Sequence, residues 1–301
     1  MGNWAEILEE LGAAPNPLDA IRRKYLDELF TLTGRNVIVY YSGWLQKPNS
    51  SGSELNDSDK TGFMNCVHRL NKAEGLDLIL HTPGGETAAT ESLIDYLKSI
   101  FGNNIRAIIP QLAMSAGTVV ACACKEIIMG KHSSLGPIDP QYQGVAAHGI
   151  VEEFERAYKE IKADNVKAAV WQPIISKYPP TFVGECDKAI KWTEQMVKDL
   201  LLSNMFSEDE PSHAKSQVER IVKELGDHAL TKSHSRHLSI DKCRDIGLKV
   251  TSLESDQKLQ EAVLSVHHAC IHTLASSAAV KIIENHLGKA YILSAQIPTM
   301  Q

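Results

Sequence analysis

Two short segments of this sequence combine residues that could bind and attack a carbonyl group. The first is a turn built on Pro83-Gly84-Gly85, where two glycines let the backbone adopt conformations closed to other residues. The second places Ser115 among small residues, in Ala113-Met114-Ser115-Ala116-Gly117. Each precedes a predicted helix, whose free N–H groups and positive end favour an oxyanion or a reactive hydroxyl. Taken singly, a tight connection and an N-cap serine are the simpler explanations; together the two segments predict a nucleophile and an oxyanion hole in one cleft.

The segments that must position these turns alternate between strands and helices. Each predicted strand is short and almost wholly apolar, which is typical of strands covered by helices on both faces. Such alternation predicts parallel strands joined by crossover helices, and hence an α/β fold. The predicted elements are a strand at 36–41, a loop at 47–59, helices at 58–72 and 86–101, strands at 76–80 and 105–109, a helix from 115 and a strand at 126–129.

After residue 149 the pattern becomes mainly helical. A long final helix is predicted over 256–286, because Gly288 just after it suits a helix C-cap. Shorter amphipathic helices are predicted at 150–162, 184–205 and 216–225.

The chain therefore divides into three predicted parts. Apolar residues recur at intervals of three and four near the N-terminus, which predicts a helical arm over residues 1–34. The core that carries both turns is expected over residues 35–253. A C-terminal helical segment is expected over residues 254–301.

Composition and charge argue against several classes of protein. The net charge is −6 and no dense run of Lys or Arg occurs, so nucleic acid, which needs a concentrated basic face, is not an expected partner. No run of about eighteen apolar residues predicts a membrane span, and the first residues do not resemble a signal peptide. Because six scattered cysteines do not form a disulfide framework, we expect a cytoplasmic protein.

Two pairs of side chains have spacings that metal ligands sometimes show. Cys122 and Cys124 lie in an apolar run without a second pair, so we expect them to fill the core. His268 and His272 share one helix face without an acidic partner, so we expect them to pack against neighbouring elements. We therefore expect no metal and no cofactor.

Four segments, in the same order, resemble a known family. With them the chain is similar to the Clp-fold serine peptidases, which include the Clp protease proteolytic subunit and signal peptide peptidase A, and most closely to the serine dehydrogenase proteinase family. The resemblance covers roughly residues 36–250 and implies a Clp/crotonase-like β-β-α superhelical core, a peptide or protein substrate and a homo-oligomer. The segments are 81–85 (His-Thr-Pro-Gly-Gly), 114–118 (Met-Ser-Ala-Gly-Thr), 135–141 (Leu-Gly-Pro-Ile-Asp-Pro-Gln) and 246–250 (Ile-Gly-Leu-Lys-Val).

The resemblance also implies roles for residues of the two turns. Ser115 would attack the scissile carbonyl. The backbone N–H groups of Gly84 and Ala116 would stabilise the resulting oxyanion, with Gly85 in the same turn. Losing one such donor costs on the order of a hundredfold in rate.

The sequence alone does not identify the general base. A serine hydroxyl needs an acceptor for its proton, usually a His or Lys within hydrogen-bond reach. The histidine of the Clp protease subunit has no counterpart between Gly136 and Asp139. His234 is the first candidate, because the segment before the Gly-Leu element lines the cleft in the relatives. Asp139, which could orient a histidine or accept the proton itself, comes next. His132 and Lys167 follow in that order.

Two other classes of function compete with the peptidase. Crotonase-like acyl-CoA enzymes hold a thioester oxygen with the same paired N–H groups but need no serine, so the Ser-Ala-Gly-Thr turn favours the peptidase. A non-catalytic Clp-fold scaffold that binds peptides would explain the missing Clp-type histidine. A separate ATP-dependent unfoldase is left open as a partner, since the chain has no phosphate-binding loop of its own.

Overall fold

The computed structural model describes residues 4–11, 17–142, 144–226 and 233–295, and it centres on a seven-stranded sheet. Five neighbouring strands are parallel, whereas the last two are antiparallel to their neighbours. The predicted α/β class, with parallel strands joined by helices, is confirmed. In spatial order the strands are β10 (Val250–Ser252), β5 (Glu126–Met129), β3 (Ile105–Ile109), β2 (Leu76–His81), β1 (Asn36–Ser42), β11 (Ala279–Asn285) and β12 (Ala290–Ser294).

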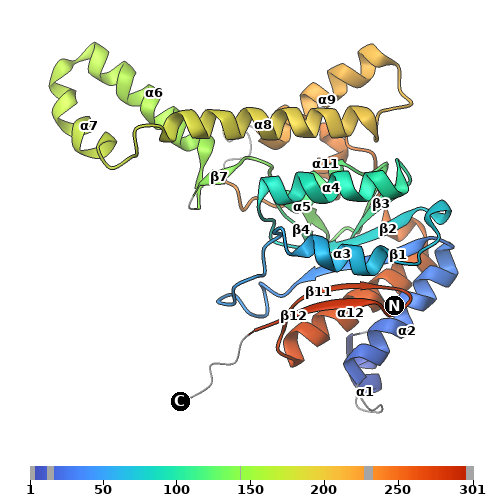
Figure 1. The fold of residues 1–301 in the computed structure, drawn as a ribbon. Coiled ribbons are helices and arrows are strands. Elements are labelled where there is room, and N and C mark those ends of the chain that lie inside the picture. Colours follow the sequence, from blue (N-terminus) through green and yellow to red (C-terminus); the bar gives the residue numbers. More distant parts are fainter. Residues whose placement is uncertain (1–3, 12–16, 143, 227–232, 296–301) are drawn as a thin grey trace, which may run out of the picture.

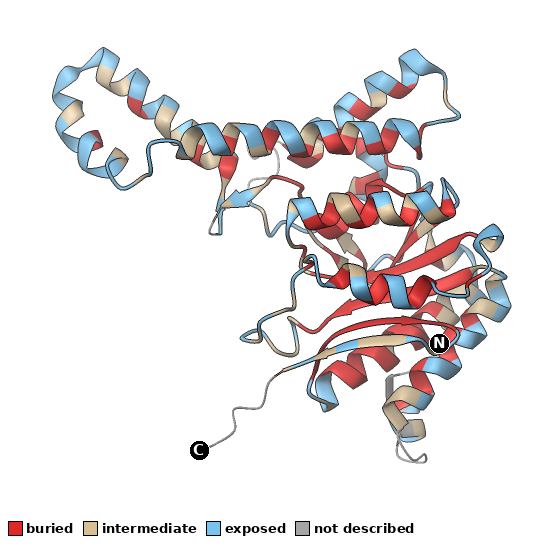
Figure 2. Ribbon diagram, in the orientation of Figure 1, coloured by how far each residue is buried: buried red, intermediate tan, exposed pale blue. Residues whose placement is uncertain are grey.

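Alternate side chains of the strands supply two hydrophobic cores, one on each face of the sheet. Figure 2 shows the buried residues along the central strands and on the helices that cover them. On β1, Ile38 and Tyr40 belong to one core, and Val39 and Tyr41 to the other. The first core packs under α3 (Asp59–Val67), α4 (Thr87–Phe101), α5 (Ala116–Cys122), α8 (Phe182–Ser203), α9 (Pro211–Gly226) and α11 (Ile240–Ile246). The second packs under α1 (Trp4–Leu11), α2 (Pro17–Thr33) and α12 (Gln257–Ser276).

Smaller pairings lie above the carboxyl ends of the parallel strands. A three-stranded sheet joins β4 (Leu112–Ala113), β6 (Ser134–Leu135) and β9 (Leu238–Ser239), and a hairpin joins β7 (Gln141–Tyr142) to β8 (Val145–Ala146). The carboxyl ends of parallel strands are where α/β proteins build their sites. Single turns of 3₁₀-helix occur at η1 (Lys72–Glu74), η2 (Asn165–Lys167) and η3 (Leu253–Ser255).

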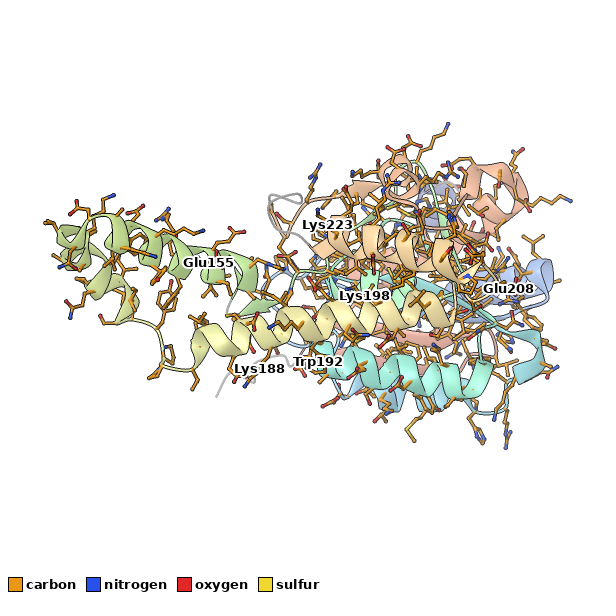
Figure 3. All side chains as sticks on the ribbon, turned by 90° about the horizontal axis from the view of Figure 1, so that it is seen from above. Glu155, Lys188, Trp192, Lys198, Glu208 and Lys223 are labelled. Atoms are coloured by element: carbon orange, nitrogen blue, oxygen red, sulfur yellow. The ribbon has the colours of Figure 1, made fainter. Side chains whose placement is uncertain are left out.

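A helical projection extends from the body of the molecule (Figure 1). It consists of α6 (Ala147–Ala163), α7 (Ala168–Ile175) and the first part of α8. Seen from above, Lys188, Trp192 and Lys198 follow α8 toward the body, while Glu155 lies out on α6 (Figure 3). Trp192 Nε1 donates to Glu91 at 3.3 Å and so joins α8 to α4.

The predicted helix over 256–286 is wrong after Ser276. There α12 ends, and residues 279–285 form β11, every residue of which is buried between β1 and β12. The β-branched residues of Ala279-Val280-Lys281-Ile282-Ile283 suit a strand, and pairing with β1 decides between two structures that an apolar run alone does not distinguish.

The N-terminal and C-terminal parts pack on the same sheet as the core. The predicted N-terminal helices are present as α1 and α2, and α2 packs against α12 over the second hydrophobic core. The division at residues 34 and 253 stays a prediction, since the second and third parts both supply strands to the sheet and the helices of the first part pack on it. Within the described residues, no helix combines the length and apolar character needed to cross a membrane.

Candidate active site

Ser115 stands at a strained turn between β4 and α5. Its backbone has φ 51° and ψ −115°, and among the described residues only Arg69 is another non-glycine with positive φ. Backbone strain of this kind is concentrated at functional sites. The side chain makes no capping hydrogen bond to its helix, which removes the simple N-cap explanation for this serine.

Small residues around Ser115 are required by close packing against the end of β2. A Cβ on Gly117 would lie 2.5 Å from Thr82 Cγ2. Backbone hydrogen bonds from Thr82 N to Leu112 O and from Met114 N to Thr82 O, both 3.0 Å, bind the two segments together. The nucleophile turn is thus held directly against the glycine turn that follows β2.

The glycine turn approaches Ser115 more closely than any side chain would allow. Gly84 has φ 109°, and a Cβ there would lie 2.6 Å from Ser115 Cβ. Its N–H donates to Thr82 Oγ1 at 3.1 Å. Within the described part of the chain, the N–H groups of Gly85 and Ala116 have no hydrogen-bond acceptor. Of the predicted donors, Gly85 and Ala116 are therefore the two whose N–H groups are available to an oxyanion.

A histidine and a carboxylate from distant parts of the chain meet beside this turn. His234 Nδ1 lies 2.9 Å from Asp139 Oδ1, the Asp139 side chain is fully buried and the His234 side chain is 21% exposed. Asp139 Oδ2 is buried without a partner in the described structure. Contact with Asp139 through Nδ1 leaves Nε2 of His234 as the nitrogen that can face a reacting group.

One pocket of about 550 Å³ brings the nucleophile and the histidine together. Its buried wall consists of side chains from several elements, and its exposed rim carries two carboxylates, those of Glu54 and Glu86. No Lys or Arg belongs to the described lining. The lining residues are Glu54, Pro83, Gly84, Gly85, Glu86, Thr87, Thr90, Ser115, Ala116, Val119, Ile138, Pro140, Gln141, Gly144, Thr193, Met196 and His234.

The other two candidate bases lie outside this pocket. His132 is exposed on the turn after β5, where its ring lies against Gly130. Lys167 is paired with Glu160 at 3.6 Å on the helical projection, and its side chain is 47% exposed. The structure therefore places His234 in the pocket with Asp139 buried behind it, and it leaves His132 and Lys167 away from the pocket.

Thr118 is a site residue that sequence reasoning missed. Its Oγ1 accepts from Gly136 N at 2.9 Å and lies 3.0 Å from Ala113 O, so it ties both flanks of the nucleophile turn to the Leu-Gly-Pro segment. Its position three residues after Ser115 indicates that it lies near the nucleophile, but its partner Gly136 could not be inferred from spacing.

The predicted core-filling cysteines are buried. Burial raises the pKa of Cys122 and Cys124, that of Cys124 to about 12, which keeps both thiols protonated and unreactive. His272 is buried in α12, as expected for a packing residue. Over the described ranges, no group of three or more His, Cys, Asp or Glu side chains is arranged to hold a metal ion.

A family comparison decides the class of this protein. The model of the ClpP-like SDH-type serine proteinases matches residues 51–268, well over half of the chain. This chain belongs to that family. The resemblance inferred from the four sequence segments is thereby confirmed. Ser115, Gly85, Asp139 and His234 all lie within the part matched to the family.

The individual relatives of this family member are distant. Two uncharacterized proteins of Methanocaldococcus jannaschii are 30% identical over 194 residues (64% of this chain) and 32% identical over 171 residues (56% of this chain), and the match spans 58% of the length of each. A solved structure of a mutant 1510-N membrane-bound stomatin-specific protease has 15% identity and a TM-score of 0.39, covering 69% of this chain and 79% of that one. A structural likeness this weak adds nothing to the family assignment.

Proposed function

We propose that this protein is a serine peptidase that cleaves peptide or protein substrates with Ser115 as its nucleophile. Membership of the family supports serine peptidase chemistry in general. The observation that carries the residue assignment is that His234, which lines the same pocket as Ser115, contacts the buried Asp139 at 2.9 Å. Such a pair supplies the base that the Clp-type alignment lacked.

In this mechanism His234 is the general base. Asp139 accepts a hydrogen bond from Nδ1–H, which leaves the unprotonated Nε2 to take the proton of the Ser115 hydroxyl. The buried carboxylate also stabilises the imidazolium that forms as the serine attacks. His234 then passes the proton to the leaving amine, and it later activates the water that hydrolyses the acyl-enzyme on Ser115.

The oxyanion of the tetrahedral intermediate would be held by the N–H groups of Gly85 and Ala116. Both lie at the pocket, next to the serine, and both lack another acceptor among the described residues. Gly84 contributes through its close approach to Ser115, since its own N–H is bonded to Thr82. Donors fixed before the reaction stabilise the developing charge without reorganisation.

Hydrolysis of casein or of fluorogenic peptides tests the proposal. Ser115→Ala should lower kcat by at least about 10³-fold, because removing a triad member leaves only the oxyanion hole and binding. Ser99→Ala, an exposed serine on α4, serves as the matched control and should leave kcat unchanged. Wild type and Ser115→Ala with equal activity would overturn the proposal and favour a peptide-binding scaffold.

The two alternative functions account for less of the site. A crotonase-like acyl-CoA enzyme needs neither the strained serine nor the His234–Asp139 pair. The scaffold hypothesis was motivated by a missing histidine, and His234 supplies one from another segment. A homo-oligomeric assembly and a cytoplasmic location stay predictions.

A further inference from the structure

A buried ion pair lies behind the oxyanion turn. Lys281, on β11, and Asp59, at the start of α3, are both buried, and Lys281 Nζ lies 2.6 Å from Asp59 Oδ1. The hydroxyl of Tyr40 donates to Asp59 Oδ2 at 2.9 Å. Two charges removed from water in this way need good geometry and further hydrogen bonds to be tolerated. The other contacts of this ion pair indicate which segment of the chain it holds in place.

The ion pair fixes residues 53–56, a segment we call the strap. Lys281 Nζ donates to the carbonyl oxygen of Glu54 at 2.8 Å, and Asp59 Oδ2 accepts from Asn56 N at 3.0 Å. At the start of the strap, Ser42 Oγ donates to Ser53 O at 2.6 Å. The strap is thus anchored by buried polar groups, to the sheet through Ser42 and Lys281 and to the start of α3 through Asp59.

The strap pairs in turn with the oxyanion turn. Leu55 N donates to Gly84 O at 2.8 Å, and Leu55 O accepts from Glu86 N at 2.9 Å. In parallel pairing of this kind the N–H of the intervening residue, Gly85, points away from the strap. A Cβ on Gly85 would lie 2.1 Å from Leu55 O, so the contact leaves no room for a side chain.

We infer that Lys281 is a positioning residue for catalysis, which acts through the strap to aim the N–H of Gly85 at the oxyanion. This inference rests on the proposed peptidase function. Lys281 lies beyond residues 51–268, the part matched by the family, so family membership does not predict its role. The strand β11, which pairs with β1, thereby becomes part of the proposed catalytic framework.

The proposal predicts that disrupting the ion pair weakens stabilisation of the transition state but not binding of the substrate. If the strap shifts, the oxyanion donor is misplaced while the rest of the pocket stays intact, and misplacement of about 1 Å can cost on the order of a hundredfold in rate. The loss should appear in kcat rather than KM, because the oxyanion exists only after attack. Binding of a peptide aldehyde inhibitor, which forms a tetrahedral adduct with the serine, should be weakened by a similar factor.

The double variant Lys281→Met/Asp59→Asn tests this role without leaving a buried charge unpaired. We expect kcat to fall about 10- to 100-fold, the Ki of a peptide aldehyde to rise by a similar factor, and KM to stay within about twofold. Tyr40→Phe, which removes one hydrogen bond to Asp59, should give a smaller loss of the same kind, and it serves as the test if the double variant does not fold.

The matched control is another buried ion pair, which joins α2 to β11. Arg22 Nε lies 2.7 Å from Glu284 Oε2, with both side chains fully buried, and neither contacts the strap. Arg22→Met/Glu284→Gln should lower the melting temperature but leave kcat and the aldehyde Ki of the folded protein unchanged.

Two outcomes separate this inference from the proposed function. Wild-type protein that neither cleaves peptides nor binds the aldehyde refutes the peptidase itself. An active wild type, together with strap variants that are folded and keep wild-type kcat and Ki, refutes the role of Lys281 alone.

Discussion

Two histidine sites lie on opposite faces of the central sheet, near the carboxyl end of β2. His234 is partly exposed, contacts a buried carboxylate and lines the pocket. His81 is fully buried and stacks against Trp44 with 4.4 Å between ring centroids. Neither ring nitrogen of His81 has a hydrogen-bond partner within the described structure. Burial lowers the pKa of His81 to about 3, so this ring stays neutral near neutral pH.

The difference shows what a histidine needs in order to act as a base. One ring nitrogen must be held by an acceptor that stabilises the charged form, and the other must face the reacting group. Of these two histidines, His234 has a carboxylate acceptor and lines the pocket, whereas the ring nitrogens of His81 have no partner in the described structure. In the proposed mechanism the face of the sheet with α4 and α8 carries the chemistry, and we expect the face with α2 and α12 to contribute stability. The following predictions test that separation.

The largest effect is expected from Asp139→Asn. The variant amide would favour the wrong tautomer of His234, and kcat should fall by about 10⁴-fold with little change in KM. Steady-state hydrolysis of a fluorogenic peptide measures both constants. His132→Ala, an exposed histidine outside the pocket, is the control and should stay within about twofold of wild type. A loss at His132 comparable to that at Asp139 would reassign the base.

A second test compares two glycines with positive φ. Gly84→Ala brings a methyl group against Ser115, whereas Gly102→Ala meets no atom within 4 Å. Both variants place a side chain at a positive φ, 109° at Gly84 and 58° at Gly102, so both carry backbone strain. We expect kcat to fall about 100-fold for Gly84→Ala and to be unchanged for Gly102→Ala, measured on folded protein. Equal kcat values for the two would show that the close approach to Ser115 does not matter.

On the face with α2 and α12, His81 should make the stability of the folded protein depend on pH. An unfolded chain protonates this ring below about pH 6.5, but the folded protein does so only near pH 3, so the folded state loses stability as the pH falls between these values. At pH 4 the loss is on the order of 3 kcal/mol. His81→Leu should reduce the drop in unfolding free energy between pH 7 and pH 4 by about that amount, as urea titrations would measure. A pH dependence identical to wild type would contradict the assignment.

The smallest effect concerns the acidic rim of the pocket. Glu54 and Glu86 are exposed there, and none of the described residues that line the pocket is Lys or Arg, so peptides with a cationic residue near the scissile bond should be favoured. Glu54→Gln/Glu86→Gln should lower kcat/KM for such peptides by up to about 10-fold at low salt, and much less at high salt. Neutral peptides provide the comparison, and an equal loss for them would contradict charge selection.

Much of the pocket side of the sheet could be predicted from local signals. Short apolar runs between turn residues predict β1, β2, β3 and β5, because burial on both faces leaves few polar positions. The strand β11 could not be predicted this way. Its Lys281 and Glu284 look like the polar positions of a helix, and only their buried partners, Asp59 and Arg22, explain them as strand residues.

The candidate site also has parts that local sequence motifs predict and parts that depend on contacts between distant segments. Ser115 and the glycine turn are recognisable because each is a compact motif. His234 and Asp139 could be named as candidates, but their contact joins residues 95 positions apart. The choice of Gly85 over Gly84 as the available donor depends on Thr82 Oγ1, a contact that spacing does not reveal.

Labelling with a fluorophosphonate probe tests the central claim most directly, because such probes react with an activated serine. Mass spectrometry of the labelled protein should find the adduct on Ser115, and Asp139→Asn and His234→Ala should slow its formation by orders of magnitude at pH 7. An adduct on another serine, or labelling of Ser115 at the wild-type rate in both variants, would contradict the account.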